Sequence, residues 1–211
     1  AGAFRDRVMA KVTNFRWVPK PDATETVYQV LQPAIRYTKD ECLDLPPMVY
    51  VKREVALTRQ QNKYYKLLRD KLVMDAGGEQ VSAANAAVAM NKLLQISCGA
   101  VYTDTGDTLE FDISHRYNVL REVIDESSKK VLVFVPFKHV IDILVDKLEG
   151  EGITTEVIRG DVPAHKRTEI FSRFQRTDNP RVLVIQPQAA AHGVTLTAAN
   201  TVVWWGPTNS L

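Results

Sequence analysis

Polar loops follow four strand-like segments in the second half of the sequence. These loops occupy residues 136–138, 159–161, 186–188 and 206–208, and they are rich in proline, glycine and glutamine, with Lys138 and Arg159 as cations. In an open parallel sheet, ligands bind to the loops at the carboxyl ends of the strands. Glycine allows close backbone approach, and amide or cationic side chains donate hydrogen bonds to phosphate and sugar oxygens. The residue types therefore favour phosphate and sugar contacts over acyl-transfer or proton-transfer chemistry.

Residue sets that could support catalysis or metal binding by themselves are absent from the sequence. It contains neither a Gly-x-x-x-x-Gly-Lys-Ser/Thr loop nor a Gly-x-Gly-x-x-Gly fingerprint, and no acidic cluster suited to magnesium. The histidines and cysteines lie in separate segments without companions at metal-ligand spacing, at His115, His139, His165, His192, Cys42 and Cys98. We therefore expect no metal site, no catalytic residue and two reduced thiols in this chain.

The elements that must position the loops alternate between strand and helix from residue 130 onward. Strands are predicted at 131–135, 153–158, 181–185 and 201–205, and the first and third of these are largely apolar runs. Amphipathic spacing predicts helices at 137–149 and 163–176, and a short helix at 188–192. Such strands are typically covered on both faces, so Trp204 and Trp205 are expected to pack in the core. The alternation predicts an α/β fold with a parallel sheet flanked by helices.

The first 130 residues show a less regular pattern. Residues 1–45 are expected to form an irregular or helical extension, because Pro19, Pro21 and Pro33 would interrupt a long helix. The β-rich run 48–57 predicts a strand, and Thr58 is a good N-cap for the amphipathic helix that follows. This helix is predicted to run from residue 59 to about residue 73, and the glycines at 77–78 end it. A second helix at 80–97, a hairpin at 100–111 and a third helix at 114–126 are predicted to follow.

Composition and charge narrow the class of protein. The 211 residues are 45% hydrophobic, which excludes a disordered chain, a collagen-like rod and a disulfide scaffold. The sequence contains no uncharged apolar stretch of about 18 residues, so no membrane span is predicted. The net charge is only +2, but residues 46–73 carry seven basic and two acidic residues, and residues 159–181 carry six and three. Residues 100–130 carry seven acids against four bases, so either a basic face with an acidic back or a mixed solvated surface is possible.

Five segments, in order along the chain, resemble one known family. The segments LLQISCGAVY (93–102), KVLVFVPFKH (130–139) and HGVTLTAANTVVWWG (192–206) resemble the second motor lobe of Swi/Snf-type helicase-like ATPases, and they are most similar to bacteriophage versions. Residues 31–47 resemble the segment that links the two lobes of that family. Residues 55–65 (VALTRQQNKYY) resemble the Leu-Thr-x-x-Gln-x-x-x-Tyr motif that opens the second lobe.

The resemblance implies a RecA-like lobe at 46–211, preceded by a linker or extension at 1–45. It implies Mg²⁺ and ATP held mainly by a first lobe, and DNA bound across both lobes without sequence preference. The family's DNA-contacting motifs fall on Pro136, Phe137, Lys138, Arg159, Gly160, Gln186 and Gln188. Its nucleotide-contacting positions fall on Gly193 and Thr195, although the family commonly has Asn or Asp where Thr195 stands.

Two motifs that the family needs for ATP hydrolysis are missing from this sequence. The phosphate-binding loop of the first lobe is absent, and the sequence stops before the Gln-x-x-x-Arg-x-x-Arg motif that supplies an arginine finger. We expect this chain alone to lack ATPase activity, and a phage-encoded protein would act in the cytoplasm of a bacterial host.

Other interpretations of the sequence stay open at this point. A RecA-like module without motor activity could bind DNA or protein, and an unrelated nucleotide-sugar enzyme could use Asp161 to bind its nucleotide. Arg159 could form an ion pair with Asp161 or Glu156 instead of contacting DNA. Phe137 could stack on a base or contact the backbone.

Overall fold

The computed structural model describes residues 2–35, 37, 47–78, 83–103, 106–190 and 195–207. The chain forms two compact units, 1–51 and 52–211. The predicted division between residues 45 and 46 lies outside the described residues, so it stays a prediction.

The N-terminal unit contains two short helices, which agree with a partly helical extension, and a small hairpin, where the prediction of an irregular segment is wrong. Its elements are α1 (Gly2–Val8), β1 (Met9–Lys11), β2 (Trp17–Pro19) and α2 (Ala23–Leu31), with β1 and β2 antiparallel. The three prolines lie at element boundaries, where the missing N–H and the fixed φ are tolerated: Pro19 ends β2, Pro21 precedes α2 and Pro33 follows it. Short elements between prolines escape a search for long periodic patterns.

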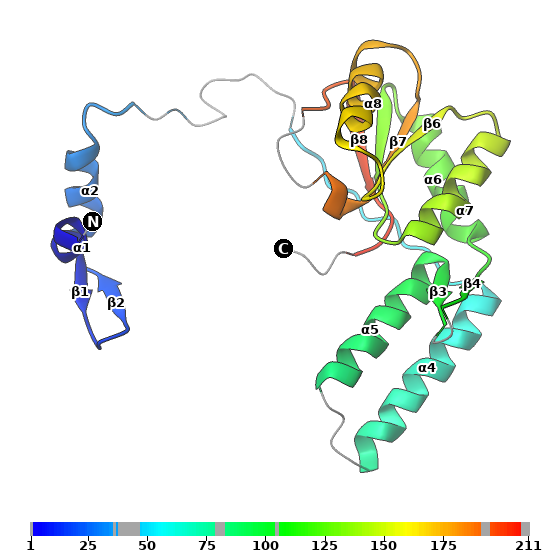
Figure 1. Ribbon diagram of the computed structural model, residues 1–211, viewed down its shortest axis with the longest axis horizontal. Helices are drawn as coiled ribbons and strands as arrows, with labels where there is room; N and C mark the ends of the chain where they lie inside the picture. The colour runs from blue at the N-terminus through cyan, green and yellow to red at the C-terminus, as the bar shows by residue number, and fades with distance from the viewer. Residues whose placement is uncertain are drawn as a thin grey trace. The chain divides into compact units, whose positions relative to one another are not determined.

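A four-stranded parallel sheet forms the centre of the second unit, as predicted (Figure 1). Its strands are β5 (Lys130–Phe134), β6 (Thr155–Ile158), β7 (Val182–Ile185) and β8 (Ala199–Trp204), in the spatial order β6-β7-β5-β8. The flanking helices are α6 (Ser114–Glu126), α7 (Lys138–Gly150) and α8 (Ala164–Arg176), and a 3-10 turn, η1 (Pro187–Ala189), follows β7. The fold is that of a RecA-like α/β lobe.

Alternating strand residues divide the core into two layers. On one face, side chains of α6 and α7 pack against Val131, Val133, Val182 and Val184. On the other face, Phe174 of α8 packs with Leu132, Ile158, Leu183 and Ile185. This alternation is what a strand's period of two requires when both faces of a sheet are covered.

Coverage of the sheet fails at β8, which corrects the prediction for Trp204. Trp205 is 4% exposed, but Trp204 is 58% exposed and Val202 is 53% exposed. Trp204 pairs in register with Phe134 and stacks on its ring at 4.5 Å between centroids, on the face that α8 covers elsewhere. Because β8 is the outer strand of the described sheet, α8 does not cover this end of the face. Only Trp205 is a core residue.

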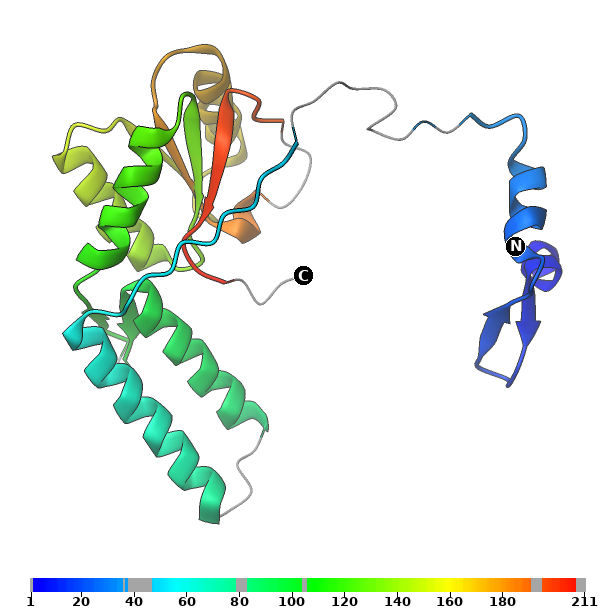
Figure 2. The ribbon, with the colours of Figure 1, turned by 180° about the vertical axis from the view of Figure 1, so that it is seen from behind.

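Two helices that form a hairpin precede the sheet, and Figures 1 and 2 show them side by side, projecting from it. They are α4 (Arg59–Gly78) and α5 (Ala83–Cys98), and the small hairpin β3 (Ala100–Tyr102) and β4 (Thr108–Glu110) follows, as predicted. None of the helices in the described ranges combines the length and apolar character needed to cross a bilayer.

The strand predicted at 48–57 is wrong, because the structure has no regular element in 47–58. This extended segment is held by side chains instead: Arg53 forms an ion pair with Glu126 at 2.8 Å, and Nδ1 of His115 lies 3.1 Å from the carbonyl oxygen of Ala56. Residues with high strand propensity also favour extended chain, and a strand needs a neighbour that local sequence does not reveal.

Candidate functional site

Loops at the carboxyl ends of the parallel strands form the candidate site. The side-chain carbonyl of Gln186, directly after β7, accepts a hydrogen bond from the main-chain N–H of Gly160 at 3.1 Å. The N–H of Gln186 in turn donates to the carbonyl of Ile158 at 2.8 Å. The structure thus brings together two predicted site residues from different loops. The Nε2 group of Gln186 has no partner among the described residues and is available to a ligand.

Charged side chains from α7 and from the loop after β6 meet beside these loops. Arg159 donates to Asp142 of α7 at 2.6 Å and to Asp161 at 2.9 Å. Lys138, at the start of α7, lies 3.6 Å from the other oxygen of Asp161. The ion pair of Arg159 with Asp161 is one of the two alternatives from the sequence; the other, Glu156, binds Arg173 at 2.8 Å instead. We call Lys138, Asp142, Arg159 and Asp161 the loop cluster.

The electrostatics of the loop cluster follow from these contacts. The hydrogen bond to Asp142 is the main cause that raises the pKa of Arg159 above its usual range. Desolvation opposes ionisation of Asp161, but the charges of Arg159 and Lys138 outweigh it and hold the pKa of this carboxyl below its usual range. Two cations and two carboxylates make the cluster neutral. It can exchange a carboxylate partner for a phosphate, but it has no excess positive charge.

Arg167, which the sequence analysis did not identify, holds the loops after β6 and β7 together through hydrogen bonds. Its guanidinium donates to three main-chain carbonyls: Val162 at 2.7 Å, Gly160 at 3.1 Å and Ala189 at 3.1 Å. It therefore connects the loop after β6 to the turn after β7. No local pattern distinguishes Arg167 from the other basic residues of α8, because its partners come from two other segments.

A second positioning contact lies at the start of α4, where Thr58 and Gln61 form a capping box. The N–H of Thr58 donates to the side-chain oxygen of Gln61 at 3.2 Å, and the N–H of Gln61 donates to the Thr58 hydroxyl at 3.4 Å. The Gln61 amide also donates to the carbonyl of Ile96 at 2.9 Å, near the end of α5. The sequence predicts Thr58 as the N-cap. The role of Gln61 was missed, although the spacing Thr-x-x-Gln is that of a capping box.

The end of β8 is fixed to α5 and α6. The indole N–H of Trp205 donates to the carbonyl of Cys98 at 2.8 Å, and Arg116 donates to the carbonyl of Trp205 at 2.8 Å. At Gly206, a Cβ atom would lie 2.5 Å from the sulfur of Cys98. The close approach of chain and thiol therefore requires glycine at this position.

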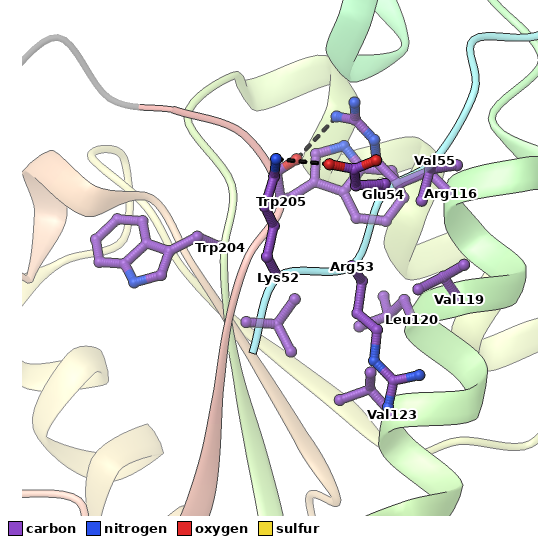
Figure 3. Close-up of a pocket in the computed structure, with 11 residues that line it drawn as sticks. Lys52, Arg53, Glu54, Val55, Arg116, Val119, Leu120, Val123, Trp204 and Trp205 are labelled. Carbon is purple, nitrogen blue, oxygen red and sulfur yellow. Dashed lines mark hydrogen bonds and ion pairs between the residues drawn. The ribbon is translucent and has the colours of Figure 1, made fainter. Parts of the chain in front are cut away.

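A pocket of about 490 Å³ lies between the extended segment, α6 and β8 (Figure 3). Val119, Leu120 and Val123 line it from α6, and Trp205 lines it directly after β8. Its three cations have partners: Lys52 contacts Glu54 at 2.6 Å, Arg53 contacts Glu126, and Arg116 donates to the carbonyl of Trp205. Figure 3 shows the indole of Trp204 directed away from Trp205. None of the predicted site residues lines this pocket.

The remaining predicted residues do not all lie at this edge of the sheet, since Thr195 comes four residues before the amino end of β8. Phe137 immediately precedes α7 and packs partly against the core, while Gln188 in η1 is exposed. Thr195 is exposed, and Gly193 lies outside the described residues. No group of three metal-ligating side chains occurs in the described part of the chain, so these residues do not fit a magnesium site.

Part of this chain matches a known domain family, and most of it is similar to known proteins. Residues 115–211 match the family described as the helicase conserved C-terminal domain. An ATP-dependent helicase of Mycoplasma genitalium, named as uncharacterised, is 28% identical over 184 residues, covering 81% of this chain and 17% of the relative. The CHD3-type chromatin-remodelling factor PICKLE of Arabidopsis thaliana is 23% identical over 208 residues, covering 90% of this chain and 15% of the relative. The chain spans a fifth or less of the length of these relatives.

Solved structures support the fold. The C-terminal domain of the Sulfolobus solfataricus SWI2/SNF2 ATPase has a TM-score of 0.60 and 22% identity, covering 72% of this chain and 68% of that domain. The core domain of the same protein has a TM-score of 0.60 and 21% identity, covering 89% of this chain and 41% of that one. The matched domain covers the second half of the chain, and the shared fold is that of a RecA-like lobe.

Proposed function

We propose that this chain is the C-terminal motor lobe of an ATP-dependent DNA translocase, which contacts the DNA backbone without reading base sequence. The observation that carries the proposal is the convergence of the loops after β6 and β7, linked by the contact between Gly160 and Gln186, with Lys138 after β5 paired to Asp161. The names of the relatives, an ATP-dependent helicase and a chromatin-remodelling factor, support DNA as the substrate.

The donors of the site suit phosphate oxygens. Lys138 is 47% exposed and holds its carboxylate partner at 3.6 Å, so its ammonium keeps donors for a ligand. Arg159 would exchange Asp161 or Asp142 for a phosphate. Gln186 and Gln188 would add amide donors from the neighbouring loop, and Pro136, Phe137 and Gly160 would shape the approach of the backbone. Contacts of this kind position a duplex and carry no sequence information.

Nucleotide binding in this proposal requires a second RecA-like lobe. Gly193 and Thr195 would face ATP across the cleft between the lobes, and Mg²⁺ with the phosphates would be held mainly by the first lobe. We therefore propose that the chain by itself does not hydrolyse ATP, because it lacks a phosphate-binding loop. ATP turnover by the purified chain that disappears on substitution of Thr195 would contradict this.

Charge-removing variants test the DNA contacts. Lys138→Ala and Arg159→Ala should each weaken duplex binding by a similar factor on two unrelated sequences, and each should lower the slope of log affinity against log salt by about 0.9. Lys129→Ala removes an exposed cation at the opposite edge of the sheet and serves as the control. Fluorescence titration measures both quantities. Unchanged slopes in both site variants would contradict the proposed contacts.

A further inference from the structure

Three cations form an exposed row on α4, outside the loop cluster. Arg59, Lys63 and Lys66 occupy positions i, i+4 and i+7, which fall on one face of a helix. All three are exposed, and none has an ion-pair or hydrogen-bond partner among the described residues. Buried Gln61 and half-buried Leu68 project from the opposite side of α4. At about 1.5 Å per residue, the row extends about 10 Å along the helix.

Helix stability does not explain this row. Arg59 and Lys63 are a like-charge pair at i and i+4, an arrangement that destabilises a helix. Arg59 is also the first residue of α4, whose first turn contains no acid, and a cation at a helix N-terminus opposes the macrodipole. The neighbouring Arg69 differs, because Asp70 neutralises it at 2.7 Å. An external anion would offset the repulsion that the fold leaves in place.

The row begins close to the edge of the sheet that carries the site loops. Gln61, in the first turn of α4, binds the carbonyl of Ile96 near the end of α5. Cys98, the last residue of α5, accepts the indole N–H of Trp205 at the carboxyl end of β8. From there the hairpin projects outward (Figures 1 and 2). A ligand long enough to extend beyond the site loops is therefore needed to contact both regions.

The loop cluster and the α4 row complement each other in charge. The cluster is neutral, with Lys138 and Arg159 balanced by Asp142 and Asp161. The three cations of the row form no ion pair with any described residue. Affinity of a protein for duplex DNA depends largely on the number of phosphates that its cations neutralise. The row supplies the excess charge that the loops lack.

We propose that Arg59, Lys63 and Lys66 of α4 bind the sugar-phosphate backbone of duplex DNA and provide a contact separate from the loops at the strand ends. This inference rests on the proposed function for the identity of its ligand. It assigns a role to the basic segment 46–73, whose charge the strand-end site does not use.

Paired charge removals test the α4 row. The Lys63→Gln, Lys66→Gln double variant is compared with a Lys129→Gln, Arg176→Gln double variant. This control removes two exposed cations at the amino edge of the sheet that have no ion-pair partner in the part of the chain that the structure describes. The α4 variant should lower the slope of log affinity against log salt by about 1.8, since each phosphate contact contributes about 0.9. The control should leave the slope unchanged, and Lys63→Arg with Lys66→Arg should retain it.

The outcomes separate this inference from the proposed function. If the α4 variant keeps the parental slope while Lys138→Ala lowers it, the α4 contact is overturned and the strand-end contacts stand. An equal loss in the α4 and control variants would also overturn it, because the charges would then act without position. If the parent chain fails to bind duplex DNA at low salt, both proposals fail. Thermal melting of each variant verifies that it is folded.

Discussion

At the scale of single residues, the close approach of Gly206 to Cys98 gives a direct test of the packing at the end of β8. A Cβ at residue 206 would lie 2.5 Å from the buried sulfur. Gly206→Ala should therefore destabilise the fold by about 1–3 kcal/mol, the usual cost of overpacking. Adding Cys98→Ala removes the clashing atom, so the double variant should lose less stability than the sum of the single ones. Urea unfolding measures the cycle, and additive effects would contradict the packing.

Asp161 gives a prediction for pH at the same scale. The charges of Arg159 and Lys138 lower its pKa in the folded chain, against the effect of desolvation. Its contribution to stability is therefore fully present above the pKa of the unfolded state, about 3.9, and is lost as the pH falls through the lower folded value. Asp161→Asn should lose less stability than the parent chain below about pH 4. Identical acid unfolding curves, relative to neutral pH, would contradict this coupling.

At the scale of elements, α4 depends on its capping box. Thr58→Ala removes the hydroxyl that accepts the N–H of Gln61 and donates to the carbonyl of Asp112 at 3.2 Å. The expected cost is about 1 kcal/mol, within the range measured for N-cap removal, and Thr58→Ser should recover most of it. Chemical unfolding with both variants measures this. A neutral Thr58→Ala would show that the cap does not stabilise α4.

Much of the element pattern was predictable from the sequence because it depends on local periodicity. The apolar runs after residue 130 gave the parallel sheet, and the prediction that site loops share one edge is consistent with the contact between Gly160 and Gln186. The predictions of a strand at 48–57 and of a buried Trp204 were wrong because they depend on non-local contacts. Both depend on which strands lie side by side, and Arg167 likewise finds its partners in distant segments.

At the scale of the whole molecule, the charge distribution suggests that two regions contribute differently to the proposed DNA binding. The neutral loop cluster would set the position of the duplex, and the basic row of α4 would add affinity. Both contacts use phosphates, so neither would discriminate among base sequences. The lobe would therefore hold DNA in any sequence context, as a translocating motor requires.

Duplex binding by the purified chain tests the central claim most directly. Affinity for two duplexes of equal length and unrelated sequence should be the same, with a dissociation constant on the order of 10⁻⁴ to 10⁻⁶ M, the usual range of nonspecific binding at physiological salt. It should fall linearly as log salt rises. Affinity that does not respond to salt, or that differs strongly between the two sequences, would contradict a lobe that grips the DNA backbone.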